Sequence, residues 1–445
     1  MDIDAIFKAY DIRGVYPSQI DQEVAHATGR AFVDFLGARR IVIGRDMRAS
    51  SEPLSTAFIT GAVAQGADVI DIGLASTDLL YFASGTLDCP GAMFTASHNP
   101  PEYNGIKLCR AGAAPVGENS GLPDIKAKVA AGEIGRGPRT GSIERRDVMD
   151  AYVKHLLSFV DLSRLRPIVV AADTANGMGG LTVPRVFEAL PFRLRALFTE
   201  LDGTFPNHPA DPLQPENLAD LRALVLSEGA AVGLAFDGDA DRCFIVDERG
   251  EPVSGSLTAA LVARSILRRH PGETVIHNVI CSRVVPETIR KHGGTPVRSR
   301  VGHSFIKKVM AETGAIFGGE HSGHYYFRDF WRADSGMTAA LHVLETICEQ
   351  DRPLSEILAP FRRYWNSGEV NVAVTDTAEA LRRATEPWPQ DRRDFIDGLT
   401  VEFDDWWFNL RPSNTEPLLR LNVEARDAAA GAARRDEVLA LLRGA

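Results

Sequence analysis

Three carboxylates stand on alternate residues in the segment from Asp237 to Arg242, Asp-Gly-Asp-Ala-Asp-Arg, between two apolar runs that are typical of strands. Carboxylate oxygens that converge on one point suit a hard divalent cation such as Mg²⁺ or Ca²⁺. Without a cation the carboxylates would repel one another and raise their own proton affinity, so a solvated acidic turn is the weaker interpretation. An EF-hand is rejected, because its sixth position needs glycine and holds Arg242, and because its flanks must be helices. We predict a metal loop with the ligands Asp237, Asp239 and Asp241.

A second candidate is Ser97, in the segment Thr95-Ala-Ser-His-Asn-Pro100. An apolar run precedes this segment, so Ser97 is expected in a loop at the carboxyl end of a strand, where α/β sheets bind their ligands. A serine followed by His98 is a candidate nucleophile, and Lys107 could neutralise a phosphate there. The alternative is that Ser97 and Asn99 only shape a turn or cap a helix, and spacing alone does not separate the two interpretations.

Glu320, Ser322 and His324 lie between glycines in the segment 318–324, directly after an apolar run. Glycine lets the backbone approach a ligand, and a carboxylate with a hydroxyl can hydrogen-bond the paired hydroxyls of a sugar. The H-E-x-x-H pattern of zinc proteases is missing, so the histidines are weak evidence for a metal. We predict a sugar site, with a tight polar turn as the alternative.

The segment Arg411-Pro-Ser-Asn-Thr-Glu-Pro417 places a guanidinium beside the polar side chains of Ser413, Asn414 and Thr415. Arginine matches phosphate oxygens and small polar residues add neutral donors, so the segment is a candidate phosphate cradle. A hairpin turn explains its two prolines equally well.

Three weaker signals remain. Lys8, Tyr10 and Arg13 cluster near the amino terminus, where solvated charge is the usual explanation. His303, in Val301-Gly-His-Ser304, is interpreted as part of a helix start that Ser304 caps. Gly177-Met-Gly-Gly180 lacks the third glycine of a dinucleotide loop, so no nicotinamide cofactor is expected.

These motifs lie in a chain whose strand-like and helix-like segments alternate, as in βαβ units around a mixed or parallel sheet. The expected strands lie at 40–44, 67–73, 91–95, 168–173, 231–236, 243–246, 274–280 and 296–301. The expected helices lie at 52–65, 79–86, 147–160, after 177, and at 215–228, 256–269, 283–292, 304–312 and 335–349. The tail predicts a small antiparallel α+β domain, with strands at 369–374, 399–403, 406–410 and 418–423 and a helix at 427–443.

Composition limits the class of protein. Lys plus Arg number 49 and Asp plus Glu number 59, a net charge of −10, which disfavours binding to nucleic acid or a membrane surface by charge. With 44% hydrophobic and 24% charged residues, no spanning apolar run and no signal-peptide pattern, a cytoplasmic enzyme is expected. The five cysteines never form a C-x-x-C pair, so buried reduced thiols are predicted.

Taken together and in this order, the four loops resemble those of the α-D-phosphohexomutases, specifically the bacterial phosphomannomutase and phosphoglucomutase branch. The 445 residues suggest about three domains at roughly 150 each, whereas the resemblance implies four. The expected fold is three similar mixed-sheet α/β domains, at 1–141, 142–248 and 249–362, and a smaller C-terminal α+β domain at 363–445, around a central cleft.

The resemblance also assigns roles to residues. Ser97 is carried as a phosphoserine, whose phosphate completes a Mg²⁺ site with Asp237, Asp239 and Asp241. The expected catalytic set is Ser97, His98, Lys107, Arg13, Arg242, His303 and His324. Of these, His303 or His324 is favoured as general acid and base, because only histidine titrates near neutral pH without a large shift. Glu320, Ser322 and His324 are expected to bind the sugar, and Arg411, Ser413, Asn414 and Thr415, with Tyr10 and Lys8, the phosphate.

The implied reaction interconverts mannose 1-phosphate and mannose 6-phosphate through a hexose 1,6-bisphosphate, which also serves as activator. Glucose phosphates are a second substrate, and glucose or glucosamine phosphate as the main one is the alternative. A metal-dependent phosphatase and a non-catalytic Ca²⁺-binding module are further rivals. Several relatives carry a basic residue near Ile280, where this chain is apolar, so the departure bears on the range of sugars.

Overall fold

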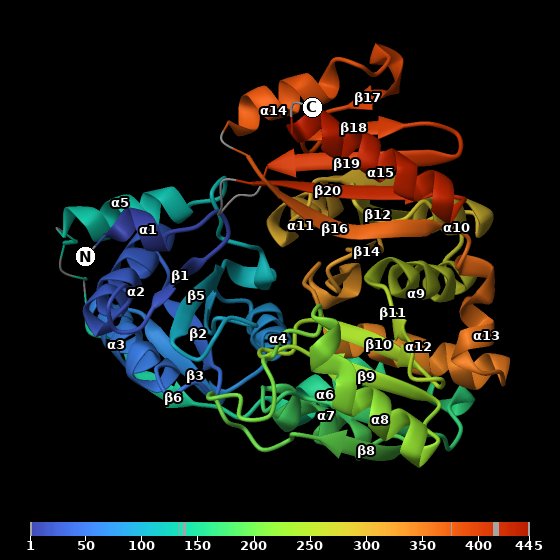
Figure 1. Cartoon of the computed structure of the whole chain (residues 1–445). Helices are drawn as coiled ribbons and strands as arrows, with labels where there is room; N and C mark the ends of the chain where they lie inside the picture. The colour runs from blue at the N-terminus through green and yellow to red at the C-terminus, as the bar shows by residue number, and fades with distance from the viewer. Residues whose placement is uncertain are drawn as a thin grey trace. The chain divides into compact units, whose positions relative to one another are not determined.

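The computed structural model describes residues 2–132, 134–135, 137, 139–374, 376–412 and 418–443. The chain divides into two compact units, coloured along the chain in Figure 1. The first unit comprises residues 1–258 and 322–357, and the second comprises residues 259–321 and 358–445. Within the described residues, no helix is both long enough and apolar enough to cross a membrane.

The first sheet of the first unit is mixed. Its strand order is β1-β5-β4-β2-β3-β6, in which β2 pairs in parallel with β3 and β4, and β5 runs antiparallel to β1 and β4. The strands are β1 (Ile12–Val15), β2 (Arg40–Arg45), β3 (Asp68–Leu74), β4 (Gly91–Phe94), β5 (Tyr103–Cys109) and β6 (Ile143–Arg145). The helices are α1 (Ile3–Ile6), α2 (Gln22–Leu36), α3 (Ser51–Ala64), α4 (Thr77–Leu87) and α5 (Leu122–Ala131). Phe32 of α2, Phe58 of α3 and Phe94 of β4 join helices and sheet in one core.

The second sheet, in the order β11-β10-β9-β7-β8, is also mixed. β7 runs parallel to β8 and β9, and β10 returns antiparallel beside β9. The short loop between β9 and β10 therefore lies at the carboxyl end of β9. The strands are β7 (Val169–Asp173), β8 (Arg193–Leu197), β9 (Val232–Phe236), β10 (Cys243–Asp247) and β11 (Pro252–Val253). The remaining helices of this unit are α6 (Met149–Leu157), α7 (Gly179–Phe187), α8 (Ala219–Glu228), α12 (Gly336–Gln350) and α13 (Leu354–Leu358). α13 ends at the unit boundary, and the strand β15 (Tyr325–Phe327) precedes α12.

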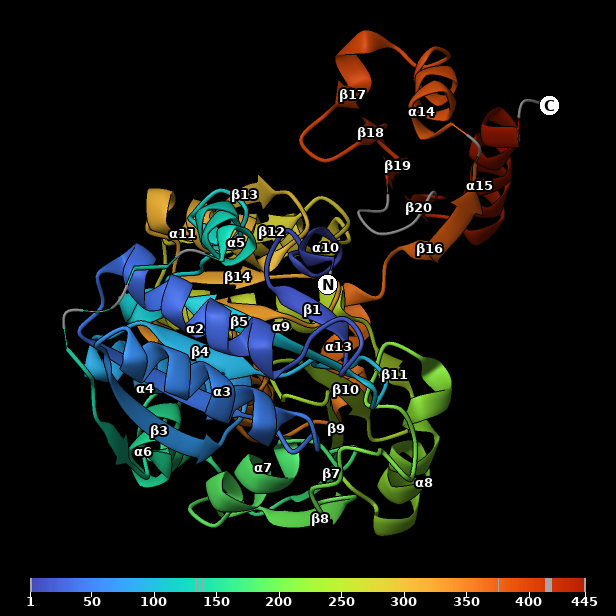
Figure 2. The ribbon, with the colours of Figure 1, turned by 90° about the vertical axis from the view of Figure 1, so that its left-hand side faces the viewer.

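The second unit contains a parallel group of strands and an antiparallel sheet. β12 (Thr274–Asn278) lies between β13 (Thr295–Ser299) and β14 (Phe317–Gly319), with the helices α9 (Gly255–Arg269), α10 (Val284–Lys291) and α11 (His303–Thr313). The antiparallel sheet has the order β16-β20-β19-β18-β17. Its elements are β16 (Trp365–Ala373), β17 (Arg393–Asp394), β18 (Leu399–Glu402), β19 (Trp406–Pro412), β20 (Leu418–Ala425), α14 (Thr377–Thr385) and α15 (Ala428–Arg443). Figure 2 shows α14 and α15 beside this sheet.

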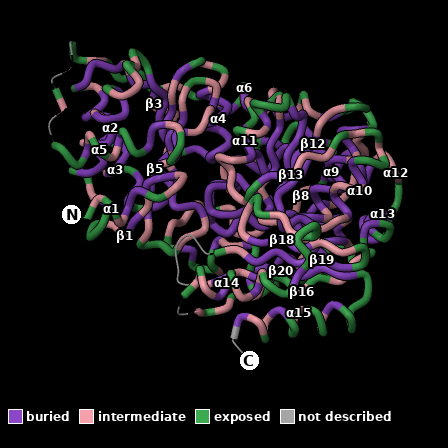
Figure 3. The backbone as a smooth tube through the Cα atoms, turned by 90° about the horizontal axis from the view of Figure 1, so that it is seen from above, coloured by how far each residue is buried: buried purple, intermediate pink, exposed green. Residues whose placement is uncertain are grey.

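The predicted fold class is confirmed: three mixed α/β sheets and a C-terminal antiparallel sheet domain. The predicted domain boundaries at 141, 248 and 362 stay predictions. All five cysteines are buried and free, as predicted. Figure 3 shows the burial pattern that supports the fold, with buried backbone along the strands and exposed residues on outer helices such as α15.

Candidate active site

Ser97 occupies the loop after β4, as the sequence predicts, in a backbone conformation that is unusual for serine. Its φ is 51°, in the left-handed region, and its amide donates to Oγ1 of Thr95 at 2.9 Å. The side chain is nearly inaccessible, with the residue 5% exposed, and Oγ donates to Oδ2 of Asp237 at 2.8 Å. Such strain at a reactive residue persists only where the surroundings hold it.

Arg48 holds the Ser97 loop in place, and sequence reasoning missed it. Its guanidinium donates to four backbone carbonyls, those of Ser97 (2.9 Å), Asn99 (2.6 Å), Pro100 (2.6 Å) and Tyr103 (3.0 Å). Asp46 lies 3.3 Å from Nε of Arg48 and balances this buried charge. The available signal was the charged run that directly follows β2, at the carboxyl end of a strand.

The metal loop meets the Ser97 loop at Gly238. A Cβ at this position would lie 2.3 Å from the carbonyl oxygen of Ser97, so only glycine permits the contact. Asp237, Asp239 and Asp241 are buried, and one carboxylate oxygen from each lies within 4.8 Å of the others. The structure therefore brings the predicted nucleophile and the predicted metal ligands together.

Two cations, half-buried Lys107 and buried Arg242, pair with the three carboxylates. Nζ of Lys107, on β5, lies 2.7 Å from Oδ2 of Asp239 and 2.6 Å from Oδ2 of Asp241. Arg242 donates from Nε to Oδ2 of Asp237 at 2.8 Å and from its amide to Oδ1 at 3.2 Å. Lys107 and Arg242, two members of the sequence-based catalytic set, are thus in direct contact with the carboxylates of the metal loop.

The pKa values in this cluster follow from burial and these pairs. Burial raises the pKa of Asp237, and the neighbouring carboxylates add to the rise against the opposing charge of Arg242. Burial also opposes ionisation of Asp239, but the Lys107 ammonium outweighs it and the pKa of Asp239 lies below its ordinary value. The pKa of Lys107 is raised well above its usual range, because Asp239 and Asp241 outweigh the desolvation that would lower it.

The residues of the loop fit a hard divalent cation. Oδ1 of Asp239 and Oδ1 of Asp241 are buried and have no hydrogen-bond partner among the described residues. Buried carboxylate oxygens are costly unless something binds them. Three converging carboxylates with unsatisfied oxygens match the ligand preference of Mg²⁺, so the predicted ligand set is chemically suitable.

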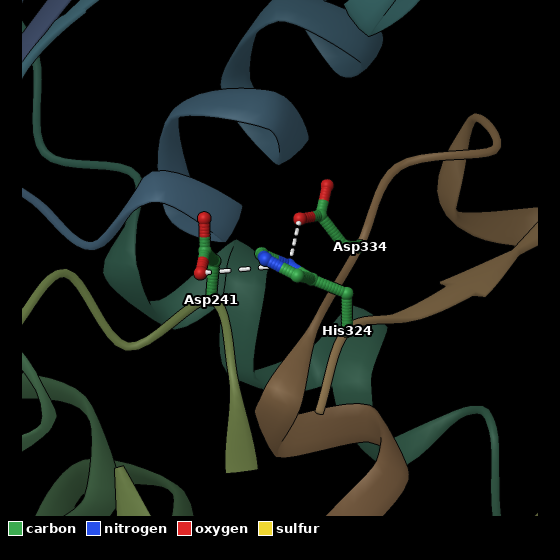
Figure 4. A group of neighbouring side chains, drawn as sticks. All are labelled: Asp241, His324 and Asp334. Carbon is green, nitrogen blue, oxygen red and sulfur yellow. Dashed lines mark hydrogen bonds and ion pairs between the residues drawn. The ribbon is translucent and has the colours of Figure 1, made fainter. Parts of the chain in front are cut away.

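His324 lies against the same loop, as Figure 4 shows. Its Nδ1 is 2.9 Å from Oδ2 of Asp334 and 3.8 Å from Oδ1 of Asp241. Burial works against the charged imidazole, yet Asp241 and Asp334 together raise the pKa of His324. His324 therefore holds a proton near neutral pH more readily than an ordinary histidine. Asp334 was not among the sequence-based candidates, because it stands ten residues from His324 with no motif around it.

Two further members of the catalytic set lie beside Ser97. Nδ1 of His98 is 3.2 Å from Oγ of Ser97, and burial with the charges of Arg242 and Arg13 holds the pKa of His98 well below its usual value. Arg13, on β1, donates to Oδ1 of Asn99 at 2.6 Å and pairs with Asp11 at 2.5 Å.

The amino-terminal phosphate candidates are not tested by these contacts. Lys8 is exposed and Tyr10 is half-buried just before β1, so their phosphate-binding roles stay predictions.

In the second unit, Glu320 follows β14 and is 1% exposed. Its Oε2 accepts from Nδ2 of Asn278 at 3.0 Å and from the amide of Gly302 at 3.1 Å. Gly302 has φ 123°, which a side chain would strain, and it precedes His303, the first residue of α11. Asn278 was not predicted, although it ends β12 at the edge where ligands bind. Ser322, the other sugar candidate, is half-buried in the first unit.

Arg411 is the last residue but one of β19 in the second unit and pairs with Glu369, its Nη2 lying 2.6 Å from Oε2. Arg420 reaches the other oxygen of Glu369 at 3.2 Å. The remaining phosphate candidates, Ser413, Asn414 and Thr415, lie outside the described residues. Ile280 is buried, 7% exposed, two residues after the end of β12.

Comparisons with known proteins match four successive segments of the chain. The descriptions "Phosphoglucomutase/phosphomannomutase, alpha/beta/alpha domain" I, II and III match residues 4–134, 150–250 and 254–364, and that of the C-terminal domain matches 369–441. A phosphomannomutase of Salmonella montevideo is 40% identical over 98% of each chain, and a protein of Xanthomonas campestris named phosphohexose mutases is 41% identical over 98% of this chain and 99% of its own. A crystal structure of a phosphoglucomutase/phosphomannomutase family protein from Burkholderia thailandensis superposes with a TM-score of 0.91 at 35% identity, covering 99% of this chain and 98% of that one.

Proposed function

Because the chain belongs to the phosphoglucomutase/phosphomannomutase family, an enzyme family of phosphohexose mutases, we propose that it interconverts mannose 1-phosphate and mannose 6-phosphate through a phosphorylated Ser97. The single observation that carries the proposal is the Ser97 contact: its Oγ lies 2.8 Å from Asp237, inside a buried cluster of carboxylates and cations. A phosphoserine brings nearly two negative charges, which a divalent cation at the three carboxylates together with Lys107 would offset.

The transfer makes one bond and breaks one bond. The phosphorus leaves Oγ of Ser97 for the free hydroxyl oxygen of the sugar, which loses its proton, and Oγ regains a proton. The product of this half is a hexose 1,6-bisphosphate. After it turns round, its other phosphate returns to Ser97 by the same chemistry in reverse, and the isomeric monophosphate leaves.

The residues around Ser97 suit this transfer. A bound Mg²⁺, held by Asp237, Asp239 and Asp241 with the phosphate, would supply positive charge to the phosphoryl oxygens. Lys107 and Arg242 add fixed charge at the same loop. His324, whose pKa is raised by Asp241 and Asp334, is suited to deliver a proton, and His303 remains the other histidine that we assign to proton transfer.

The choice of sugar rests on sequence relationships. The similar proteins are named phosphomannomutase and phosphohexose mutases, and the Ser322-Gly-His324 ending favours mannose with glucose as a second substrate. Glu320, held by Asn278 and the Gly302 amide, is the proposed acceptor for sugar hydroxyls, and Arg411 with residues 413–415 binds the phosphate that does not react. Glucose or glucosamine phosphate as the main substrate is the second candidate. The observation that favours it is Ile280, a buried apolar residue at a place where several relatives carry a basic residue.

Phosphorus NMR tests the proposal directly. The protein is incubated with Mg²⁺, a trace of the matching 1,6-bisphosphate and either mannose 1-phosphate or glucose 1-phosphate. We expect a growing 6-phosphate signal without free phosphate, faster for mannose. Free phosphate alone would identify a phosphatase. No change with either sugar, when mass spectrometry shows Ser97 phosphorylated, would exclude both and call for glucosamine phosphate.

A further inference from the structure

The first turn of α4, comprising Ser76, Thr77 and Asp78, touches the metal loop from within the core of the first unit. Ser76 caps the helix, because its Oγ accepts from the amide of Leu79 at 3.3 Å. All three residues are buried, with exposures of 0–1%. The side chains of Thr77 and Asp78 hydrogen-bond to other parts of the protein.

Thr77 makes two hydrogen bonds to Asp239. Its amide donates to the backbone carbonyl of Asp239 at 3.0 Å, and its Oγ1 donates to Oδ2 at 2.6 Å. Oδ2 is also the oxygen that Lys107 binds, at 2.7 Å. Two donors thus occupy Oδ2, whereas Oδ1 has no hydrogen-bond partner among the described residues.

Asp78, the next residue, supports the segment that carries Asp334. Its Oδ2 accepts from the hydroxyl of Tyr152 at 2.7 Å and from Oγ of Ser335 at 2.8 Å. Ser335 caps α12 and directly follows Asp334, the residue that binds Nδ1 of His324. Two adjacent residues of α4 therefore reach the two sides of the active-site cluster.

We propose that the first turn of α4 positions the catalytic centre: Thr77 fixes which oxygen of Asp239 binds the metal, and Asp78, through Ser335, fixes the Asp334–His324 pair. Both act through other residues and are positioning residues rather than catalytic ones. The inference rests on the proposed function for the identity of the metal and the reaction. The hydrogen bonds around a ligand set its orientation, and their loss commonly weakens metal binding by roughly 10- to 100-fold.

The proposed role of Thr77 is tested by measuring metal binding in the absence of turnover. Thr77→Val keeps the shape of the side chain and removes the hydroxyl, whereas Thr77→Ser keeps the hydroxyl. Mn²⁺ is titrated into each full-length protein by calorimetry and by electron paramagnetic resonance. We expect Thr77→Val to bind Mn²⁺ about 10-fold or more weakly and Thr77→Ser to stay within about threefold of the unchanged protein. Thr60→Val is the matched control, because the exposed hydroxyl of Thr60 donates within its own helix, to the carbonyl of Thr56 at 2.9 Å.

Wild-type Mn²⁺ affinity in a folded Thr77→Val protein would overturn this role. If that variant does not fold, Thr77→Cys, with a weaker donor of similar size, takes its place; an intermediate affinity is expected and wild-type affinity overturns the inference.

The proposed role of Asp78 predicts a different signature. Ser335→Ala should lower kcat several-fold while Mn²⁺ affinity stays unchanged, and Ser335→Thr should restore kcat. Equal losses of Mn²⁺ affinity in Ser335→Ala and Thr77→Val would contradict the separate roles of Thr77 and Asp78. If the protein isomerised no hexose phosphate, the proposed function would fail, whereas the Mn²⁺ titrations would still decide the role of Thr77.

Discussion

In the first unit the carboxylates of the metal loop are bound by cations, Lys107 and Arg242, whereas in the second unit Oε2 of Glu320 accepts from two neutral donors, Asn278 and the amide of Gly302. Both loops follow buried strands, and the carboxylate residues of both are almost inaccessible to solvent. Under the proposed function, this difference reflects the charge of the ligand that each loop would hold.

This difference corresponds to two kinds of recognition. A site that takes up a dication and a phosphoryl group needs several carboxylates close together, and these repel one another. Fixed ammonium and guanidinium groups offset that repulsion before the ligand binds. A carboxylate that recognises neutral hydroxyls needs only a fixed direction, and neutral donors on one oxygen supply it. The predictions that follow break one side of this contrast at a time.

The largest effect is expected from Ser97→Ala. Removing the nucleophile should lower turnover of mannose 1-phosphate by on the order of 10⁴-fold or more, since no other group can carry the phosphoryl between the two transfers. A coupled assay for mannose 6-phosphate measures the loss. Mn²⁺ affinity should change little, because the three carboxylates remain. Ordinary turnover in this variant would contradict the phosphoserine assignment.

Lys107→Met should give the next largest effect, on the free energy of unfolding. It leaves Asp239 and Asp241 buried without their cation, which typically costs about 3–5 kcal/mol. Urea unfolding measures the loss, and Mg²⁺ should restore part of it, because a dication replaces the missing charge. Lys126→Met is the control: its pair with Asp4 is exposed and should contribute less than about 1 kcal/mol. A loss that Mg²⁺ does not reduce would argue against a metal at this loop.

These residues also show what sequence can and cannot reveal. Asp237, Asp239 and Asp241 were predictable because their geometry is local, two residues apart in one loop. Thr77 and Asp239 are separated by 162 residues, and Asp78 and Ser335 by 257, so no motif joins them and only the fold does. Among the strands, β2, β4, β7 and β9 were predicted from their apolar runs.

Two of the strands that the sequence prediction lacks, β8 and β1, lie at sheet edges. β8, Arg193–Leu197, lies at a sheet edge with mixed exposed and half-buried residues, and it therefore carries no apolar run. β1 is likewise a short edge strand. An edge strand is paired on one side only, so its sequence need not be apolar on both faces.

A smaller effect is expected from His277, which precedes Asn278 on β12. Burial lowers the pKa of His277 to about 4, and Arg298 and Arg290 add to this against Glu402. The unfolded chain binds a proton near pH 6.5 and the folded chain near pH 4, so stability falls as the pH drops through this window, by about 2 kcal/mol at pH 5. Hydrogen exchange of the β12 peptide between pH 7 and pH 5 measures it.

His277→Gln should flatten this pH dependence, whereas His270→Gln, at an exposed residue after α9, should leave it unchanged. An equally steep dependence in the His277 variant would place the titrating group elsewhere.

The smallest effect is expected from Asn278→Ala, which removes a neutral donor to Oε2 of Glu320. No charge is exposed, so the loss should be that of one hydrogen bond, about 1 kcal/mol, or roughly a fivefold rise in KM for the hexose phosphate with kcat within about threefold. Mn²⁺ affinity should not change. Asn371→Ala, at an exposed position of β16, is the control. If kcat fell instead while KM stayed constant, Glu320 would act in the transfer itself, and the contrast between a charge-balancing loop and an orienting loop would not hold.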